Sequence, residues 1–423
     1  MYLTAKKEKA LLVLVEEEKE RWSREDLSAE FKNLVSSTGI EIEELVALNL
    51  HEPNPRLYIG KGKVEELTAI VKDTGVSVVI FNNDLHFTQQ RNLEDHFGVK
   101  TIDRTQLILD IFAKHAQTQE GILQVELAQL QYLMPRLRGK GIMLSRLGGG
   151  IGTRGPGEKK LEVDRRTIAE HISRLKKELK KVSQHRELIR KKRQKNKTAV
   201  CSLVGYTNAG KTTLFNRLTQ DSQVTSSALF TTLDTVSRNF TLLNKAKIIL
   251  SDTVGFIYKL PPYLVDSFKA TLEELHYCDI LLHVIDSSNK NILQVKKAVD
   301  KTLKELDLQS KPAITVFNKI DLLDEQDKKN LMQEYPEAIF ISAAKDINIQ
   351  NLKKLIHEKI YQDQFEGVVK LPFDRMDIVK YLHANCEILN VTYQETEAVY
   401  WIRTRPDKIA YLKGQGLEVK EIL

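Results

Sequence analysis

The chain has 423 residues, 42% of them hydrophobic and 29% charged, with a formal net charge of +7. Such a chain has apolar material for about two to four globular domains, and no apolar run approaches the roughly 18 residues of a membrane span. Its start lacks the cleavage site of a secretory signal, so we expect a cytoplasmic protein. The three cysteines are widely spaced in apolar stretches, which predicts buried thiols and argues against a disulfide framework or a metal site.

Residues 1–104 alternate apolar runs with helical patterns, which predicts a small α/β domain. We expect helices from about Arg24 and Lys63, and strands at 10–15, 45–50, 56–60 and 76–81. GKGK at 60–63 would lie between a strand and a helix. We favour a tight turn there, with a phosphate site at the helix N-terminus as the alternative.

Residues 105–196 predict two long helices that form an antiparallel hairpin. On the first helix, residues spaced 4, 3, 4 and 3 apart form an apolar seam: Leu123, Leu127, Leu130, Met134 and Leu137. The second helix repeats this spacing with Ile168, Ile172, Leu175, Leu179 and Val182. Each seam can bury itself on the other, and such a rod can reach away from a globular body.

The loop between these helices, 139–157, is rich in glycine and flanked by positive charge. The following helix carries 16 Lys or Arg against five Asp or Glu between 159 and 197, a surplus of 11. GxGxxG at 150–155 is not a dinucleotide site, because no strand precedes it. The charge predicts a polyanion partner, with a flexible connector as the alternative. The expected RNA contacts are Arg136, Arg138, Lys140, Arg146 and Arg154.

A phosphate-binding loop is predicted at 205–212, where GYTNAGKT follows the β-branched run at 198–204 and precedes a helical pattern. Lys211 would neutralise the β and γ phosphates, and the Thr212 hydroxyl would bind Mg²⁺. We expect nucleotide contacts along the loop and the start of the helix: Gly205, Tyr206, Thr207, Asn208, Ala209, Gly210, Lys211, Thr212 and Thr213.

Two downstream segments complete the predicted metal and γ-phosphate site. The strand at 248–252 ends in Asp252, which would support the magnesium, and the N–H of Gly255 could sense the γ-phosphate. In FTTLDT (230–235), Thr232 is our candidate for a switch threonine that closes over Mg²⁺, with Thr231 as its rival. The predicted catalytic residues are Lys211, Thr232 and Gly255, and Phe230 is an expected nucleotide contact.

The base specificity follows from NKID at 318–321. The Asp321 carboxylate can accept from the guanine N1–H and 2-amino groups, whereas adenine offers no such pair. We therefore expect Asn318, Lys319 and Asp321 to bind guanine. Ser342 and Ala343 would touch its carbonyl, although the third position of this SAA sequence is Ala344 where Lys is usual.

DTVGF (252–256) ends in Phe256, which has no atom that can orient an attacking water. Intrinsic hydrolysis is therefore expected to be slow, and a group donated by a partner would accelerate it. Two sources within the chain stay open. Asn208 could hold K⁺ in place of an arginine, and Arg238 could swing toward the phosphates.

Three segments make the chain resemble the HflX family of ribosome-associated GTPases over nearly its whole length: RLYIGKGKVEEL (56–67), DRTQLILDIFAKHAQTQEGILQVELAQLQY (103–132) and LSRLGGGIGTRGPGEKKLEVDRRTI (144–168). Many relatives read LDPT where this chain has LDTV (233–236), which weakens the assignment of Thr232. The resemblance implies a helical hairpin whose loop enters the large ribosomal subunit. It also implies a protein that splits stalled or idle ribosomes.

The expected fold class is α/β, with a central P-loop GTPase domain at 197–363. A small α/β domain (1–104) and a long antiparallel helical hairpin (105–196) precede it, and a small α+β C-terminal domain (364–423) follows. The expected function is a monomeric GTPase with Mg²⁺ that acts on ribosomes through the large-subunit rRNA. The alternative is a GTP-gated RNA-binding scaffold in ribosomal subunit assembly. A nucleotide-driven RNA unwinder and a membrane role are disfavoured.

Overall fold

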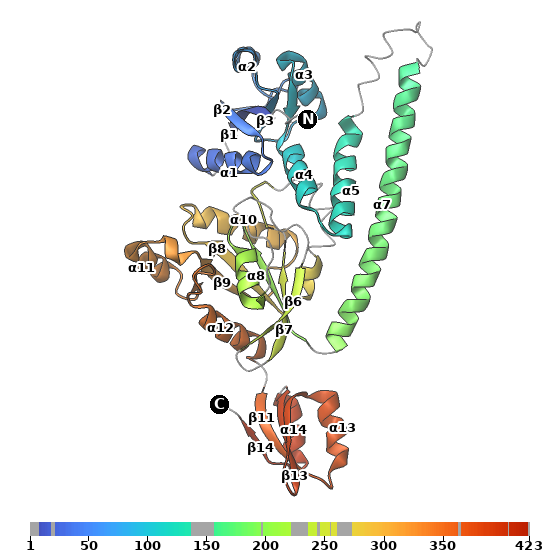
Figure 1. Ribbon diagram of the computed structural model, residues 1–423, viewed down its shortest axis with the longest axis vertical. Helices are drawn as coiled ribbons and strands as arrows, with labels where there is room; N and C mark the ends of the chain where they lie inside the picture. The colour runs from blue at the N-terminus through green and yellow to red at the C-terminus, as the bar shows by residue number, and fades with distance from the viewer. Residues whose placement is uncertain are drawn as a thin grey trace, which may run out of the picture.

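The computed structural model describes residues 8–17, 22–136, 156–195, 198–220, 236–242, 246–253, 255–259, 273–362, 365–404 and 406–421. Within these residues the elements form three sheets with their covering helices, and a long helical hairpin stands beside the first two (Figure 1). No helix in the described ranges is long and apolar enough to cross a membrane. Cys201, Cys278 and Cys386 are buried free thiols, as predicted.

The N-terminal sheet is parallel, in the order β2-β1-β3-β4. Its strands are β1 (Lys9–Glu17), β2 (Glu41–Leu50), β3 (Val78–Phe81) and β4 (Lys100–Ile102). Both faces are covered, so β1 is apolar from Ala10 to Val15. Leu12 and Leu14 pack against α1 (Arg24–Ser37) and α4 (Arg104–His115). Leu11 and Val13 pack against α2 (Lys61–Thr74) and α3 (Phe87–Phe97).

The strand predicted at 56–60 is wrong. Asn54 and Tyr58 exchange two backbone hydrogen bonds of 2.8 Å, which close a tight loop. The Asn54 side chain accepts from the N–H groups of Arg56 and Leu57, and Tyr58 takes a φ of +65°. The Asn54 side chain thus binds backbone N–H groups that would otherwise pair with a neighbouring strand. The GKGK sequence follows this loop and opens α2, with Gly60 as the N-cap residue.

The antiparallel hairpin predicted from the apolar seams is confirmed (Figure 1). Its helices are α5 (Gln119–Arg136) and α7 (Pro156–Lys195). The seam contains Leu123 and Leu127 from α5 and Leu175 from α7 as its buried residues. Leu130, Ile172 and Leu179 pack around them, at the positions that the heptad spacing indicated.

The central sheet has the order β10-β9-β8-β5-β7-β6 and is parallel except for β6. Its strands are β5 (Val200–Gly205), β6 (Val236–Thr241), β7 (Lys247–Asp252), β8 (Ile280–Asp286), β9 (Ala313–Asn318) and β10 (Ile339–Phe340). Short 3₁₀ turns lie at η1 (Glu273–Tyr277) and η2 (Ile320–Leu322). The associated helices are α8 (Lys211–Thr219), α10 (Ile292–Glu305), α11 (Glu325–Glu334) and α12 (Ile349–Tyr361).

One apolar core runs through both the N-terminal sheet and the central sheet. It joins Phe112 of α4 and Ala128 of α5 to Val204, Phe256 and Leu281 of the central unit. The other face of the central sheet has its own core, formed with α8 and α12. The N-terminal unit and the central unit therefore share buried surface and do not pack as independent bodies.

The C-terminal sheet is antiparallel, in the order β12-β13-β11-β14. Its elements, in chain order, are β11 (Phe365–Pro372), α13 (Met376–Asn385), β12 (Glu387–Tyr393), β13 (Glu397–Thr404), α14 (Pro406–Gly414) and β14 (Val419–Glu421). This β-α-β-β-α-β order confirms the expected α+β class. The Arg403 guanidinium links the sheet to α12, because it stacks 3.8 Å from the centre of the Tyr361 ring.

Candidate functional site

The predicted nucleotide-binding residues gather at the carboxyl edge of the central sheet. The loop 205–212 follows β5, Asp252 ends β7, Asn318 ends β9, and Ser342 follows β10. Ligands bind at this edge in open α/β sheets, where helix N-termini and strand ends meet. The structure thus brings together four segments that lie up to about 140 residues apart in the sequence.

Lys211 begins α8 and is buried within the phosphate-binding loop. Its ammonium group donates to the carbonyls of Gly205 (3.1 Å) and Tyr206 (2.9 Å). Burial lowers the pKa of Lys211 to about 8, with Asp252 acting in the opposite direction. Thr207 is buried beside it, and among the described residues its hydroxyl has no hydrogen-bond partner. A lysine and a hydroxyl held in this way suit a phosphate ligand.

Thr212 and Asp252 provide the oxygen atoms that a magnesium ion would need. The Thr212 hydroxyl donates to the Asp252 carboxylate at 2.9 Å, and both side chains are buried. Hydroxyl and carboxylate oxygens are the ligand types that Mg²⁺ prefers, and it usually takes few of them from protein. The two residues therefore fit the predicted metal site.

Asn318 connects three loops of the site. Its amide nitrogen donates to the carbonyl of Ala209 (3.0 Å), and its amide oxygen accepts from the N–H of Ala343 (3.0 Å). Gly210 passes so close that a Cβ there would lie 2.3 Å from the Asn318 nitrogen, and its φ is +87°. Only glycine fits this position. Asn318 thus fixes the phosphate loop and the SAA loop relative to each other.

The remaining predicted base-recognition residues lie in the loops that follow β9 and β10. Lys319 donates to Asp286 at the end of β8 (2.6 Å), while Asp321 is exposed. Ser342 is fully buried, and its hydroxyl accepts from the N–H of Lys345 (3.1 Å). Asp286 was not among the site residues that we predicted from the sequence. Its place at a strand end, like that of Asp252, was the available signal.

Gly255 and Phe256 lie directly against the phosphate loop. The Phe256 N–H donates to the carbonyl of Gly205 (3.0 Å), and its own carbonyl accepts from Thr207 (2.8 Å). A Cβ at Gly255 would lie 3.0 Å from the Lys211 ammonium nitrogen, so this glycine is placed next to the phosphate-binding lysine. The Phe256 side chain is 3% exposed and belongs to the core shared with the N-terminal unit. The Phe256 side chain therefore stabilises the packing between the two units.

A second set of contacts joins this segment to the N-terminal unit, and sequence reasoning missed it. The Tyr206 hydroxyl accepts from the N–H of Tyr258 at 2.9 Å. Trp22 packs on both rings, with centroids 6.2 Å from Tyr206 and 5.0 Å from Tyr258. Arg104 donates to the carbonyl of Tyr258 at 2.7 Å. Since these partners are up to 236 residues apart, no local pattern indicated them.

Several predicted site residues lie outside the described residues: Phe230, Thr232, Arg138, Lys140, Arg146 and Arg154. Arg136 is described, and it contacts groups of the protein itself; that it contacts RNA stays a prediction. Its guanidinium pairs with Asp103 at 2.8 Å and is only 16% exposed, so it anchors the end of α5 to the N-terminal sheet. Asn208 is exposed with a φ of +62°, and Arg238 lies on β6, where it donates to the carbonyl of Ser237.

Comparison with protein families matches three consecutive segments of the chain. Residues 25–113 match the model described as GTP-binding GTPase N-terminal, and 115–193 match the GTP-binding GTPase middle region. Residues 200–319 match the model described as 50S ribosome-binding GTPase. The GTPase HflX of Caldanaerobacter subterraneus subsp. tengcongensis is 44% identical over 393 residues, which cover 93% of this chain and 90% of the relative.

The chain belongs to the HflX family of GTPases. It is a guanine-nucleotide-binding enzyme that hydrolyses GTP. The GTPase HflX of Escherichia coli is 42% identical over 350 residues and covers 82% of both chains. A GTP-binding protein from Sulfolobus solfataricus, solved in complex with GDP, is 27% identical. That match covers 84% of this chain and 99% of the other, with a TM-score of 0.43.

Proposed function

We propose that this GTPase binds the large ribosomal subunit and separates stalled or idle ribosomes into subunits, with hydrolysis stimulated by the bound ribosome. The observation that carries the proposal is that one chain holds the predicted guanine-nucleotide residues at one sheet edge and a long basic helical hairpin beside that sheet (Figure 1). The matched family model is described as a 50S ribosome-binding GTPase, which supports the same partner.

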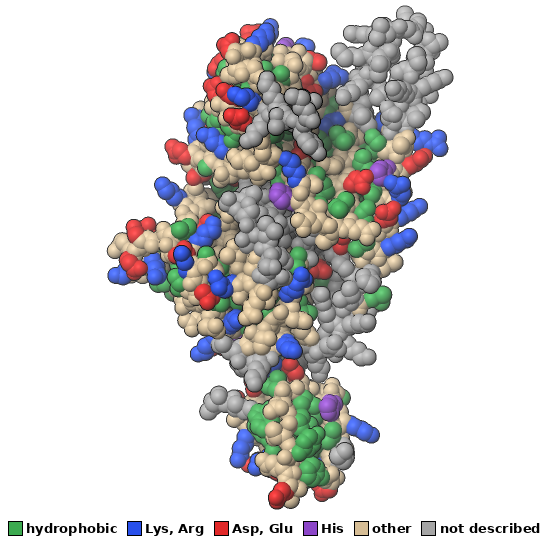
Figure 2. Space-filling view, viewed as in Figure 1, with side chains coloured by type: hydrophobic (Ala, Val, Ile, Leu, Met, Phe, Trp, Pro, Cys, Tyr) green, Lys and Arg blue, Asp and Glu red, His purple; other side chains and the backbone are tan. Residues whose placement is uncertain are grey.

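The described part of α7 offers a surface suited to phosphate groups. Figure 2 shows Lys and Arg side chains along the outer edge of the molecule where this helix lies. Seven of them are exposed: Arg165, Arg166, Arg174, Lys176, Lys177, Lys180 and Lys181. Exposed cations on a rod can neutralise a nucleic-acid backbone through counterion release, without reading its sequence. This chemistry fits rRNA as the partner.

The nucleotide site explains why a partner would govern the rate. Lys211 would bind the β and γ phosphates, and the Gly255 N–H would face the γ-phosphate. Thr212 and Asp252 would hold Mg²⁺, which neutralises phosphate charge when bound. Thr232 remains our candidate to close over the metal. Since the Phe256 side chain packs into the core, it orients no water. The missing group would come from the ribosome, or from K⁺ held by Asn208.

Single-turnover GTP hydrolysis, with and without purified large ribosomal subunits in potassium buffer, tests this proposal. We expect at least a hundredfold stimulation, together with dissociation of intact ribosomes by the GTP-bound protein in a sedimentation assay. An equal rate in sodium buffer would remove K⁺ from the mechanism. Fast hydrolysis without the subunit would place the catalytic group within this chain. Binding to immature subunits without dissociation of ribosomes would favour the assembly scaffold.

A further inference from the structure

Two adjacent residues at the start of α4 face different functional parts of the molecule. Asp103 is the N-cap residue of α4, and Arg104 is its first helical residue. The Asp103 carboxylate is 1% exposed and contacts the end of the hairpin helix α5. The Arg104 side chain is 3% exposed and contacts the segment that follows Phe256. Both residues are buried, so neither contact is a solvent-screened surface pair.

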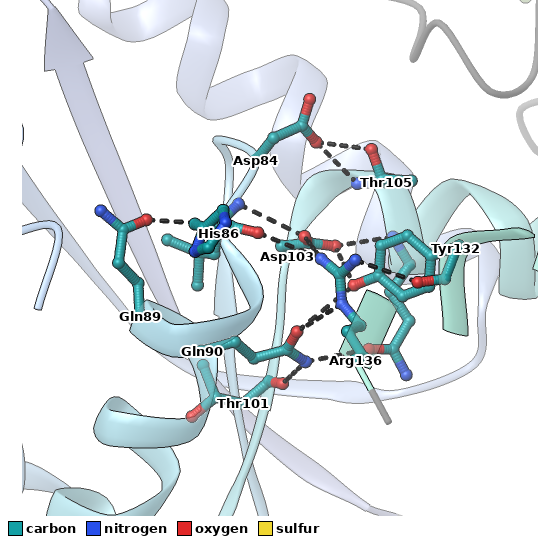
Figure 3. Close-up of polar contacts among 11 residues, drawn as sticks. Asp84, His86, Gln89, Gln90, Thr101, Asp103, Thr105, Tyr132 and Arg136 are labelled. Carbon is teal, nitrogen blue, oxygen red and sulfur yellow. Dashed lines mark hydrogen bonds and ion pairs between the residues drawn. The ribbon is translucent and has the colours of Figure 1, made fainter. Parts of the chain in front are cut away.

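Asp103 holds the end of α5 through two residues (Figure 3). The Tyr132 hydroxyl donates to one carboxylate oxygen at 2.8 Å, and Arg136 donates to the other at 2.8 Å. The Arg136 guanidinium also stacks 3.4 Å from the centre of the Tyr132 ring and donates to Gln90 at 2.9 Å. Arg136 is the last residue of α5, directly before the chain segment for which the sequence predicts RNA contact.

Arg104 bridges the N-terminal unit and the nucleotide site. Its two terminal nitrogens donate to the two oxygens of Glu30, at 3.1 and 2.5 Å. One of them also donates to the carbonyl of Tyr258 at 2.7 Å. This planar fork donates to both carboxylate oxygens and reaches the carbonyl in one fixed geometry, which the compact ammonium group of a lysine does not have. The peptide units on both sides of Tyr258 are therefore fixed, because its N–H is bound by Tyr206.

Tyr258 lies two residues after Phe256, whose backbone is bonded to Gly205 and Thr207 of the phosphate loop. A contiguous set of contacts thus runs from Arg136 through Asp103 and Arg104 to the Gly255–Tyr258 segment. Its side-chain contacts join residues far apart in the sequence: Asp103 and Arg136 are 33 residues apart, and Arg104 and Tyr258 are 154 residues apart. Coupling between distant sites needs such a physical connection and must be shown by a coupling measurement.

We propose that Arg104 is a positioning residue of the GTPase reaction, and that the Asp103–Arg104 pair couples the end of α5 to the Gly255–Tyr258 segment. Binding of the hairpin to the large subunit would displace the α4 start and thereby move the segment that faces the γ-phosphate. This part of the inference rests on the proposed function. The coupling itself is a property of the isolated protein, because linkage between two binding equilibria is reciprocal.

The isolated full-length chain therefore provides the first test. Amide hydrogen exchange is compared between the GDP complex and the complex with a non-hydrolysable GTP analogue. We expect at least a twofold difference in exchange rate at 132–136. In parallel, Trp401→Phe leaves Trp22 as the only tryptophan, and its emission reports on the Tyr206 and Tyr258 rings. Equal exchange at 132–136 in both complexes would overturn the proposal.

Arg104→Lys is the decisive variant, because it keeps the charge beside Glu30 but loses the bridge to the Tyr258 carbonyl. Its affinity for both nucleotides should stay within threefold of the parent chain, while the exchange difference at 132–136 disappears. Arg104→Met combined with Glu30→Leu removes the buried pair without leaving a lone charge, and should behave alike. Arg24→Met is the matched control: this arginine is 52% exposed and belongs to the same unit.

Large subunits provide the second test, in single-turnover hydrolysis. For Arg104→Lys we expect a stimulated rate at least tenfold below that of the parent chain. The subunit concentration at half-maximal stimulation should stay within threefold, since the basic surface is intact. Full stimulation of this variant would overturn the proposal. If the parent chain itself is not stimulated, the proposed function fails, and the exchange experiment still decides whether the coupling exists.

Discussion

Lys211 makes nucleotide binding dependent on pH. Its buried ammonium group has a pKa of about 8, below the usual value, because burial favours the neutral form. Phosphate oxygens favour the charged form of Lys211, so its pKa must be higher in the nucleotide complex than in the free protein. Nucleotide binding near pH 8 therefore takes up a proton. Raising the pH from 7 to 8.5 leaves about three quarters of the free lysine neutral, which should weaken GDP binding about fourfold.

Calorimetry of GDP binding at pH 8.5, in two buffers with different ionisation enthalpies, measures this proton directly. We expect an uptake of about 0.7 proton per nucleotide, from the same pKa of about 8. The uptake should fall toward zero at pH 6.5, where the free lysine is already charged. A heat of binding that is equal in the two buffers at pH 8.5 would contradict the assignment.

Phe256→Gln is expected to leave intrinsic hydrolysis within threefold of the parent rate, although glutamine is a residue type that can orient water. The side chain at this position points into the shared apolar core, and not toward the nucleotide. Burying an amide there without a partner would cost about 1–3 kcal/mol of unfolding free energy. Single-turnover hydrolysis and thermal unfolding measure the two effects. Phe256→Leu is the apolar control, and a tenfold faster Gln variant would contradict the placement.

The residues of the phosphate loop and NKID were predictable because each motif is local and carries its chemistry in a fixed spacing. The structure brings Lys211, Thr212, Asp252 and Asn318 to the same edge of the central sheet. Arg104 was not predictable, because its partners are set by packing between units. The ion pair between Arg136 and Asp103 was not predictable for the same reason, because Asp103 lies 33 residues earlier in the chain.

At the level of elements, the hairpin depends on its apolar seam. Leu175 of α7 is 2% exposed and belongs to the same apolar cluster as Leu123 and Leu127 of α5. Leu175→Ala should lower the local stability of α7 by about 2–4 kcal/mol, because a buried leucine leaves a cavity. Hydrogen exchange along 165–184 measures this change. Leu188→Ala on the same helix is the control, since Leu188 is 61% exposed, and equal effects of both variants would contradict the seam.

Elements with strong periodicity were predicted well, and elements decided by a single side chain were not. The heptad spacing located both hairpin helices, and the run at 397–404 is β13. By contrast, the run at 56–60 has the apolar residues of a strand, yet Asn54 closes it into a loop. An apolar pattern indicates burial, and Leu57 and Ile59 are indeed buried. The backbone conformation, however, is set by the hydrogen bonds that the Asn54 side chain accepts.

On the scale of the whole molecule, the shared core explains how a rigid connection to the hairpin is maintained. Phe112 and Val125 of the N-terminal part pack in the same cluster as Phe256 and Leu275 of the central unit. The α7 helix extends beside both units (Figure 1). Under the proposed function, a displacement of the hairpin by the ribosome would reach the nucleotide site through this buried surface.

The charge of α7 leads to a prediction about the complete protein in its proposed complex. If four exposed lysines of this helix, Lys176, Lys177, Lys180 and Lys181, contact rRNA phosphates, association with the large subunit must release counterions. Binding should then weaken steeply with salt. Changing all four to Gln should reduce the slope of log K against log salt by about 3 to 4, close to one per contact. Co-sedimentation with large subunits at several potassium concentrations gives this slope.

The matched control removes the same kind of charge from another helix. Lys297, Lys301 and Lys304 of α10 are also exposed, so their change to Gln alters net charge and keeps the four lysines of α7. This variant should change the slope by less than about 0.5, because only charges that contact phosphates release counterions in proportion to their number. Equal slopes for the two variants would assign the salt dependence to net charge, and α7 would lose its place as the rRNA-binding surface.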